Sequence, residues 1–404
     1  MIRIFLLCVT VWVATLSSSL AQVQAGAARV LPSESGVSEG WFGSTELQVT
    51  LSHGVPFRVF TLDEPARLVV DFQGLDWSDV AAEQFLGDDV GLPAVRFGTM
   101  QAGWSRLVAD MSRPMLPQEI GMTIDESSGV ARLKIDLEPV APEEFLAEAG
   151  PPTGSHWPVL TDPVVATPQS DSFVVAIDPG HGGIDPGAER GGVSEKALML
   201  DVAFELRGLL ALQPDIEVVL TRESDIFVAL ERRVAIAHQV DADLFVSLHA
   251  DALSEGGAHG ATIYTLSEEA SDAASAHLAA RHNRSDIIAG IDLSGSDDQV
   301  TQVLLDLARQ ETDPRSAALA QSFVDSMSEA GGPMNRRPLR QAGFSVLKSA
   351  DIPSILVEVG FLSSKRDLEN LQDPAWRSGM ARAMADAILN WRDADEDMRA
   401  LMRH

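Results

Sequence analysis

Two histidines and two glutamates stand where predicted strands or helices meet loops, and their side chains can hold a metal ion or move a proton. His181 follows the apolar run "FVVAI", and His249 lies at the end of the run "LFVSLHAD". Glu358 lies within "SILVEVGF", whereas Glu195 begins the helical pattern "EKALMLDVAFELRGLL". Because reactive groups in open α/β sheets gather at the carboxyl ends of the strands, we expect the four side chains to converge on one rim of a sheet.

Zinc-dependent hydrolysis is the chemistry that these residue types suit. Two imidazoles and one carboxylate bind zinc tetrahedrally and leave the fourth position for water, whose pKa falls to about 7. A further carboxylate nearby can take the water proton and pass it to a leaving nitrogen. By type, His181, Glu195 and His249 suit the ligands, and Glu358 suits the base. A single histidine at a strand end is more often structural, so the prediction depends on all four residues converging.

The loop between His181 and Glu195, within "DPGHGGIDPGAERGGVSEK", is rich in glycine, as phosphate-binding loops also are. It lacks the pattern G-x-x-x-x-G-K-[ST], and no G-x-G-x-x-G opens the helix that follows. It also carries the carboxylates of Asp178 and Asp185, which repel phosphate. We therefore interpret the glycines as the means of folding the loop tightly beside a metal, with Ser194 as the N-cap of the helix.

The first 25 residues have the pattern of a secretory signal peptide. Arg3 supplies a positive charge, an apolar run from Ile4 to about Leu16 follows, and small residues offer cleavage sites after Ala21 or Ala25. The apolar run is shorter than the roughly 20 residues that a membrane span needs. We therefore expect residues 1–25 to be removed from the mature chain during export.

The composition excludes several kinds of partner and site. The chain has 404 residues and a formal net charge of −29, with 59 acidic against 30 basic side chains. Nucleic acid is excluded as a partner because it needs a surplus of Lys and Arg, and an anionic membrane surface would repel the chain. We expect no stable membrane insertion. The only cysteine, Cys8, lies in the signal peptide, so any metal of the mature chain must be held by histidines and carboxylates.

Hydrophobic patterning divides the rest of the chain into two domains and a linker. Residues 38–138 contain short alternating runs separated by turn residues, which predicts an all-β sandwich. Residues 139–171 are rich in proline, which predicts a semi-extended linker, with the alternative that part of it packs as an ordered loop against one domain. In residues 172–395 strands alternate with helices, which predicts an α/β domain with a mainly parallel sheet. Within that domain the acidic, helical stretch of residues 267–313 is interpreted as an insertion between a strand and a helix.

Five motifs of the α/β domain, in the same order, resemble those of the zinc-dependent N-acetylmuramoyl-L-alanine amidases. They are "IDPGHGGIDPGA", "SEKALMLDVAFELRGLL", "LTRESDIFVALERRVAIAHQ", "LFVSLHADA" and "IPSILVEVGFLSS". The resemblance implies hydrolysis of the amide between N-acetylmuramic acid and the L-alanine of the peptidoglycan stem peptide. It also implies that His181, Glu195 and His249 bind Zn2+ and that Glu358 is catalytic.

The β domain resembles a wall-binding module, the AMIN domain, on the stretch "LQVTLSHGVPFRVFTLDEPARLVVDFQGL". The order of signal peptide, AMIN-like domain, linker and amidase domain is similar to that of the septum-splitting amidases of Gram-negative bacteria. This resemblance implies a periplasmic enzyme that binds peptidoglycan, remodels the cell wall and helps daughter cells to separate.

The same resemblance implies a function for the insertion. In the division amidases an extra helical segment covers the active site until a LytM-type activator protein displaces it. Residues 267–313 hold the corresponding place, which implies autoinhibition, with the zinc capped by a carboxylate of this segment or by Glu255. Relatives often carry Glu-Asn where this chain has His282 and Asn283, and an inert surface insertion is the alternative.

Two other functions are compatible with the fold alone. One is a wall-binding protein that has lost catalysis, but such proteins usually lack at least one of the four site residues. The other is a zinc peptidase that cuts within the stem peptide, and the motifs argue against it. Release of stem peptides with an N-terminal L-alanine distinguishes the amidase from both.

Overall fold

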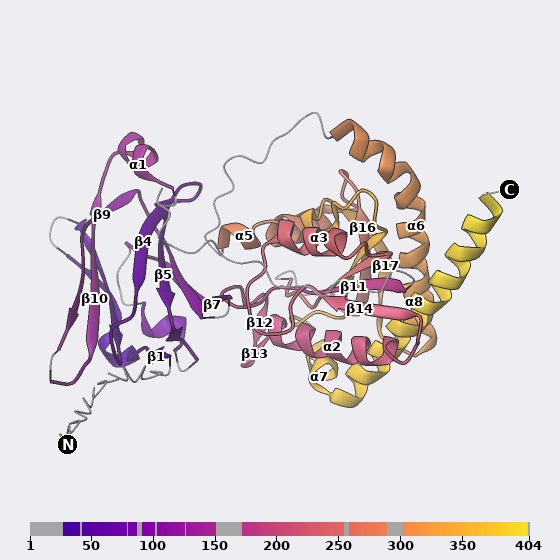
Figure 1. The fold of residues 1–404 in the computed structure, drawn as a ribbon, viewed down its shortest axis with the longest axis horizontal. Coiled ribbons are helices and arrows are strands. Elements are labelled where there is room, and N and C mark those ends of the chain that lie inside the picture. The colour runs from indigo at the N-terminus through magenta and orange to yellow at the C-terminus, as the bar shows by residue number, and fades with distance from the viewer. Residues whose placement is uncertain are drawn as a thin grey trace, which may run out of the picture.

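The computed structural model of the chain contains an N-terminal β lobe and a C-terminal α/β lobe (Figure 1). The expected signal peptide lies outside the described residues, as do residues 151–171 of the expected linker. Glu255 and residues 289–301 of the expected insertion lie outside them too. The described residues are 27–40, 43–78, 80–86, 91–101, 103–125, 127–150, 172–253, 258–288 and 302–402.

The β lobe is a sandwich of two four-stranded antiparallel sheets, as its alternating patterns predicted. In β10 every second residue from Ala131 to Leu137 is buried, so one face of the strand supplies the core. One sheet has the order β2 (Gly36–Glu39), β3 (Thr45–Leu51), β10 (Ala131–Pro139), β9 (Met115–Ile124). The other has the order β4 (Phe57–Leu62), β5 (Arg67–Gln73), β8 (Trp104–Asp110), β7 (Ala94–Gln101). The short strands β1 (Ala28–Arg29) and β6 (Leu75–Asp76) and the 3-10 turns η1 (Pro32–Glu34) and η3 (Ala82–Gln84) complete the lobe.

The first part of the expected linker differs from an extended chain, because it packs on the β lobe. After β10, helix α1 (Pro142–Glu148) begins with a proline, whose missing N–H costs nothing in the first turn. Phe145 of this helix is buried in the core of the sandwich. The N–H of Gly150 then donates to the carbonyl of Thr61 at 2.8 Å. This stretch therefore forms a helix docked on the β lobe rather than an extended spacer.

A six-stranded, mainly parallel sheet forms the centre of the α/β lobe. The pairs β14–β11, β11–β15 and β15–β18 are parallel, whereas β16 runs antiparallel to β18 and parallel to β17. β17 was not predicted from the sequence, because charged residues and Pro338 interrupt any apolar pattern. Such a strand is tolerated at a sheet edge. The order is β14 (Ile216–Leu220), β11 (Phe173–Pro179), β15 (Leu244–His249), β18 (Ser354–Glu358), β16 (Ala261–Leu266), β17 (Met334–Ala342).

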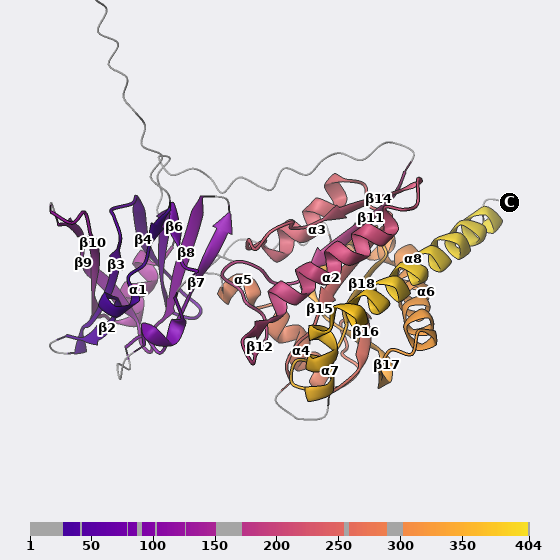
Figure 2. The same ribbon diagram turned by 90° about the horizontal axis from the view of Figure 1, so that it is seen from below.

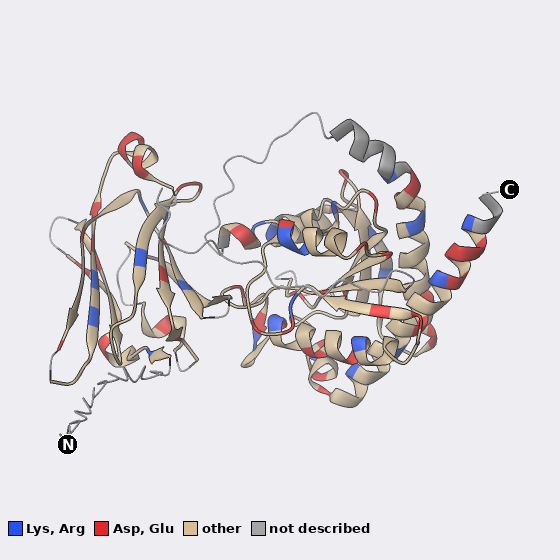
Figure 3. Cartoon of the chain, viewed as in Figure 1, with Lys and Arg blue, Asp and Glu red and all other residues tan. Residues whose placement is uncertain are grey.

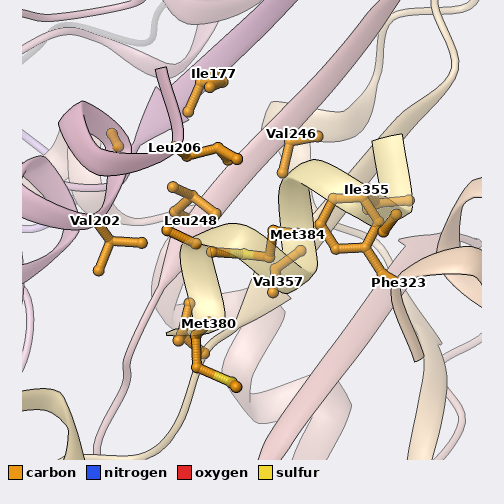
Figure 4. Close-up of a cluster of buried hydrophobic side chains, with 14 of the residues drawn as sticks. Ile177, Val202, Leu206, Val246, Leu248, Phe323, Ile355, Val357, Met380 and Met384 are labelled. Carbon is orange, nitrogen blue, oxygen red and sulfur yellow. The ribbon is translucent and has the colours of Figure 1, made fainter. Parts of the chain in front are cut away.

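Helices cover both faces of this sheet (Figures 1 and 2). On one face α2 (Glu195–Leu210), α6 (Gln302–Glu329) and α8 (Pro374–Met402) bury apolar side chains against the strands, including Val202, Phe323 and Met384 (Figure 4). On the other face lie α3 (Leu230–Gln239) and α4 (Ala273–His282). The remaining elements are the hairpin β12 (Glu189–Arg190) and β13 (Val193–Ser194), α5 (Ser285–Ile288), η4 (Ser345–Leu347) and α7 (Lys365–Gln372).

The expected insertion, residues 267–313, consists of α4, α5 and the beginning of α6 in its described part. The helix predicted to follow the insertion does not start after Pro314, because α6 runs without interruption through that proline. A proline removes one hydrogen bond from a helix, and side-chain bonds on both sides of it anchor this one. The Thr312 hydroxyl donates to the carbonyl of Ala350 at 2.6 Å, and Trp391 Nε1 donates to the carbonyl of Arg315 at 3.1 Å.

The distribution of charge and the length of the helices are relevant to nucleic-acid and membrane partners. Acidic residues occur on both lobes, for example on α1, α5 and the C-terminal part of α8 (Figure 3). No helix in the described residues combines the length and the apolar character that crossing a membrane requires.

The two lobes are in direct contact through the outer face of the sheet that contains β5. The Phe227 N–H of the α/β lobe donates to the carbonyl of Thr99 at 3.2 Å. This contact explains why β5 is buried on both of its faces. One apolar cluster spans the contact and contains Phe60, Leu62, Val69, Met100, Val108, Ile184 and Phe227.

Candidate active site

The strands of the α/β sheet deliver His249 and Glu358 side by side at one rim. They are the last residues of β15 and β18, and they are direct partners in the register of these parallel strands. Both side chains are buried. Glu358 Oε2 accepts the backbone N–H of Asp251 at 2.9 Å, which fixes one carboxylate oxygen and leaves Oε1 facing the site.

The loop after β11 brings His181 to the same rim. His181 has a positive φ of 60°, a left-handed conformation that costs energy in a residue with a side chain. Two buried arginines hold this backbone in place. Arg233 donates to the carbonyl of His181 at 2.8 Å, and Arg222 donates to the carbonyls of Pro179 and Gly180, both at 2.9 Å. Arg222 and Arg233 together therefore fix the loop.

Glu195 is the first residue of α2 and lies under the loop. Ser194 stands at the N-cap position, but its side chain makes no capping bond. The Glu195 carboxylate accepts backbone N–H groups instead, from Ala188 at Oε2 and from Ala250 at Oε1, both at 2.9 Å. Gly187, with a φ of 69°, makes room for it, because a Cβ there would lie 2.7 Å from Glu195 Oε2.

The structure brings three donor atoms of different elements together. Glu195 Oε1 lies 3.2 Å from His181 Nε2 and 3.0 Å from His249 Nδ1. Tetrahedral zinc with bonds of about 2.0–2.1 Å separates its ligand atoms by about 3.3 Å. The spacing of this donor set therefore fits a tetrahedral metal ion, and all four residues that the sequence singled out lie in one site.

Asp185 is a member of the site that the sequence did not assign. Its carboxylate accepts from His181 Nδ1 at 2.8 Å. A proton on Nδ1 leaves the lone pair of Nε2 free to bind a metal, and carboxylates often orient metal-binding histidines in this way. The spacing of Asp185 four residues after His181, in the turn "GHGGIDPG", is the sequence signal that could have indicated this role.

His282, at the end of α4, enters the site from the expected insertion. Its ring centre lies 4.2 Å from that of His249 and 5.7 Å from that of His181, and the side chain is buried. His282 Nε2 is 3.5 Å from Asp251 Oδ2 and 3.8 Å from Glu358 Oε1. Among the described residues, the group that the insertion places beside the donor set is thus an imidazole, where the sequence led us to expect a carboxylate.

Asn283 fastens this end of the insertion. Its side-chain amide donates to the carbonyl of Gly343 at 2.8 Å and accepts the N–H of Ser345 at 2.7 Å. The His282 ring also packs edge-on against Phe344, with 5.5 Å between ring centres. The imidazole is therefore held in the site by fixed contacts on the neighbouring loop. Glu255, the other group expected to cap the metal, lies outside the described residues.

Four buried side-chain atoms of this site have no hydrogen-bond partner: His181 Nε2, Asp251 Oδ2, His282 Nε2 and Glu358 Oε1. Leaving a buried polar atom unpaired costs about 1–3 kcal/mol, so such atoms are rare unless another group satisfies them. Two groups of possible metal ligands share His282: His181 and His249 form one group with it, and Asp251 and Glu358 form the other, with the ligand atoms of each group within 4.8 Å of one another. The arrangement is that of a metal site with His, Asp and Glu side chains.

The charges of the three donor residues compensate one another. Burial alone would lower the pKa of His181, but the carboxylates of Asp185 and Glu195 raise it to about 10. Burial would likewise raise the pKa of Glu195, but His181 and His249 hold it well below its usual range. In the absence of a metal ion, a proton on His181 thus supplies the positive charge that the carboxylates require.

Burial also shifts the pKa values of the other two imidazoles and of Glu358. Burial and the neighbouring imidazole of His282 lower the pKa of His249 to about 3. Burial, together with the charge of His181, lowers the pKa of His282 to about 3. Burial and the nearby Glu195 carboxylate raise the pKa of Glu358 well above its usual value. Two neutral imidazoles are therefore ready to bind a metal.

The β lobe touches both segments that enter this site. Gly98 of β7 lies against the loop after His181, because a Cβ there would come within 2.7 Å of the carbonyl oxygen of Gly183. Arg67 of β5, itself buried, donates to the carbonyl of Ile287 in α5, five residues after His282. Helix α5 lies next to the β lobe in both ribbon views (Figures 1 and 2).

Comparison with known proteins gives two matching families. A family described as N-acetylmuramoyl-L-alanine amidase matches residues 175–390, and one described as the AMIN domain matches residues 39–137. The chain is 30% identical over 394 residues to the N-acetylmuramoyl-L-alanine amidase AmiC of Escherichia coli O6:H1, covering 93% of this chain and 92% of that protein. It is 30% identical over 379 residues to AmiC of Neisseria meningitidis serogroup B, with coverage of 90% and 88%. It is 38% identical over 220 residues to AmiA of Escherichia coli, with coverage of 54% and 75%.

Proposed function

The chain belongs to the N-acetylmuramoyl-L-alanine amidase family, and from this premise we propose that it hydrolyses the amide between N-acetylmuramic acid and the L-alanine of the peptidoglycan stem peptide. The reaction remodels the cell wall and helps daughter cells to separate. The observation that carries the proposal is the group of unpaired buried atoms at the sheet rim, which combines metal-binding groups with a carboxylate able to move a proton.

Zn2+ is the metal that this donor set fits, held by His181, Glu195 and His249. Imidazole and carboxylate are zinc ligands, and the 3.0 and 3.2 Å separations of the donor atoms suit tetrahedral coordination. When bound, zinc would supply a Lewis acid that polarises the scissile carbonyl and lowers the pKa of water. Asp185 would orient His181 for this purpose through its 2.8 Å contact with Nδ1.

Glu358 is the catalytic acid and base of the proposed reaction. Its Oε1 has no hydrogen-bond partner, whereas its Oε2 is held by the Asp251 N–H, so Oε1 is the oxygen available for proton transfer. It takes a proton from the attacking water as the oxygen–carbon bond forms, and gives that proton to the nitrogen as the carbon–nitrogen bond breaks. Burial raises the pKa of Glu358, which favours the uptake of this proton.

The insertion acts as an inhibitor of this site in the proposed mechanism. His282 supplies an imidazole next to the zinc ligands and to Glu358 Oε1, where water and the scissile amide would have to lie. An activator protein of the LytM type is the partner that we expect to withdraw His282 from the site. The anchoring of Asn283 means that the activator must break two hydrogen bonds besides moving His282.

Location and domain roles follow from the same proposal. Residues 1–25 direct export and are removed, which places the enzyme in the periplasm, where its substrate is. The β domain, residues 38–138, binds peptidoglycan and concentrates the catalytic domain, residues 172–395, on the wall. The insertion of residues 267–313 is the regulatory part of the catalytic domain.

Mass spectrometry of digested peptidoglycan tests the proposed reaction. The zinc-loaded mature chain and its His282→Ala variant would each be incubated with purified sacculi. We expect release of intact stem peptides with an N-terminal L-alanine, leaving glycan strands without peptides. Products cut only between amino acids would show a peptidase instead, and the absence of any product from both proteins would contradict hydrolysis.

A further inference from the structure

A cleft of about 930 Å³ lies beside the candidate active site, between α4 and β17. It begins next to the proposed catalytic residue. Asp251, which lines the cleft, donates its N–H to Glu358, and Thr262, which also lines it, is the partner of Glu358 in the sheet register. A chain extending from the scissile bond can therefore continue directly into this cleft.

The cleft is cationic although the protein is strongly acidic. The formal net charge of the whole chain is −29, yet among the described residues that line the cleft Asp251 is the only acidic one. Its carboxylate already pairs with Arg281. Positive charge at this place is thus a local exception, and it selects an anionic ligand. Five arginines line the cleft: Arg281, Arg284, Arg336, Arg337 and Arg340.

The arginines divide into fixed and available groups. Arg340 is held by Asp272 at 2.6 Å, and Arg281 donates to the carbonyl of Ala252 at 2.8 Å. Arg284, Arg336 and Arg337 are exposed, and their guanidinium groups make no ion pair within the part of the chain that the structure describes. A guanidinium group binds a carboxylate through two parallel hydrogen bonds, which suits these three residues to carboxylate ligands.

The chemistry of the substrate indicates which part of it enters the cleft. On the sugar side of the scissile amide, the lactyl carboxyl group is the amide carbonyl itself and carries no charge. The stem peptide on the other side has free carboxylates on residues beyond L-alanine, unless these are amidated. Ala252, Leu253 and Ala273, which are partly or fully exposed, give the cleft an apolar wall for the aliphatic parts of such a peptide.

We propose that this cleft binds the free carboxylates of the stem peptide, with Arg336 and Arg337 as principal contacts, and that it makes the enzyme selective for stems that are not amidated. The inference rests on the proposed function, since it assigns the peptide side of that substrate. The cleft is open while His282 occupies the neighbouring site. A peptide can therefore bind the cleft in the inhibited enzyme.

Calorimetric titration of the full mature chain with two synthetic peptides tests this assignment. One is an N-acetylated stem tripeptide with free carboxylates, and the other is the same peptide with those groups converted to amides. We expect the amidated peptide to bind at least about tenfold more weakly, the size of effect that loss of one charge-assisted hydrogen bond produces. Arg336→Gln and Arg337→Gln should each weaken the free-carboxylate peptide about tenfold and leave the amidated peptide unchanged.

Arg382→Gln, which removes one exposed charge from α8, is the matched control and should change neither affinity. Equal affinity of the wild type for both peptides, no binding of the free-carboxylate peptide, or an equal loss in the control would each overturn the inference. The titration requires no hydrolysis. A protein that releases stem peptides but binds both peptides alike would keep the proposed function and lose this inference. One that discriminates between the peptides but releases none would lose only the proposed function.

Discussion

The candidate site has two halves that are built differently. The ligand half consists of His181, Glu195 and His249, and the plug half consists of Asp251, His282 and Glu358. In the ligand half both Glu195 oxygens accept backbone N–H groups, and one buried polar atom, His181 Nε2, has no hydrogen-bond partner. In the plug half each residue has one buried polar atom without a partner.

The ligand half is thus part of the fixed framework of the domain, whereas the plug half depends on a residue that we propose an activator removes. The ligand half is carried by a sheet strand, the start of α2 and a loop that two arginines fix. The plug half combines groups of that same framework with one residue from an insertion. Three buried atoms around the inserted residue have no hydrogen-bond partner, so we expect the two hydrogen bonds of Asn283, rather than bonds of His282 itself, to hold the insertion in place.

Replacing Glu358 by alanine should give the largest effect. Since Glu358 is proposed to move the proton and is not among the proposed ligands, we expect turnover to fall by roughly 10²–10⁴-fold while zinc is retained. Turnover would be measured as dye release from labelled peptidoglycan, and zinc by atomic emission spectroscopy. Loss of one equivalent of zinc in Glu358→Ala would move Glu358 into the ligand half and would refute the division.

Replacing Asp185 by asparagine should weaken the ligand half without removing a ligand. An asparagine cannot offer the negative charge that orients His181, so we expect zinc affinity to fall about 10–100-fold. Competition with a chromophoric chelator would measure this, and activity should recover at high zinc concentration. An unchanged zinc affinity would show that Asp185 only shapes the loop.

Replacing His282 by alanine should act in the opposite direction, because it opens the plug half. We expect the basal rate of peptidoglycan hydrolysis without activator to rise about tenfold, which corresponds to a shift of ~1.4 kcal/mol in the closed–open equilibrium. His238→Ala, which removes an exposed imidazole from α3, is the control and should leave the rate unchanged. A rate that stays the same or falls in His282→Ala would contradict inhibition by this residue.

Replacing Arg67 by alanine should have the smallest effect, because it acts on the plug half through α5. The hydrogen bond to Ile287 is one of several anchors, so we expect the basal rate to rise about threefold, as the loss of roughly 0.5–1 kcal/mol allows. Arg132→Ala, at an exposed ion pair elsewhere on the β lobe, is the control. Thermal unfolding would establish that both variants are folded. Equal rates in the two variants would show that the β lobe does not restrain the insertion.

The convergence of His181, Glu195, His249 and Glu358 on one rim could be predicted from the sequence, whereas the position of His282 could not. Apolar strands that end in His249 and Glu358 imply a shared rim, and the register of the sheet places the two side by side. The role of His282 could not be predicted in this way, because it lies on a helix of an insertion whose path depends on tertiary contacts such as those of Asn283. The resemblance led us to expect a carboxylate that caps the metal, and in the described residues the insertion places His282 there instead.

The fold shows the same division between regular and context-dependent features. Alternation predicted the sandwich, and strand–helix alternation predicted the α/β sheet. The edge strand β17 has no apolar period to reveal it, and α6 continues through Pro314, where the local signal indicates a boundary. The contact between the lobes was not predicted either. The continuous apolar run of β5 could have indicated it, since a strand buried on one face alone would alternate apolar and polar residues.

A crystal structure of the zinc-loaded mature chain would show directly which groups bind the metal. We expect one zinc ion bound by His181, Glu195 and His249, with His282 Nε2 at the fourth position and Glu358 outside the coordination sphere. A zinc ion with water or Glu255 at that position, and His282 turned away, would contradict the assignment of His282. Zinc bound elsewhere would contradict the proposed ligand set and the proposed mechanism.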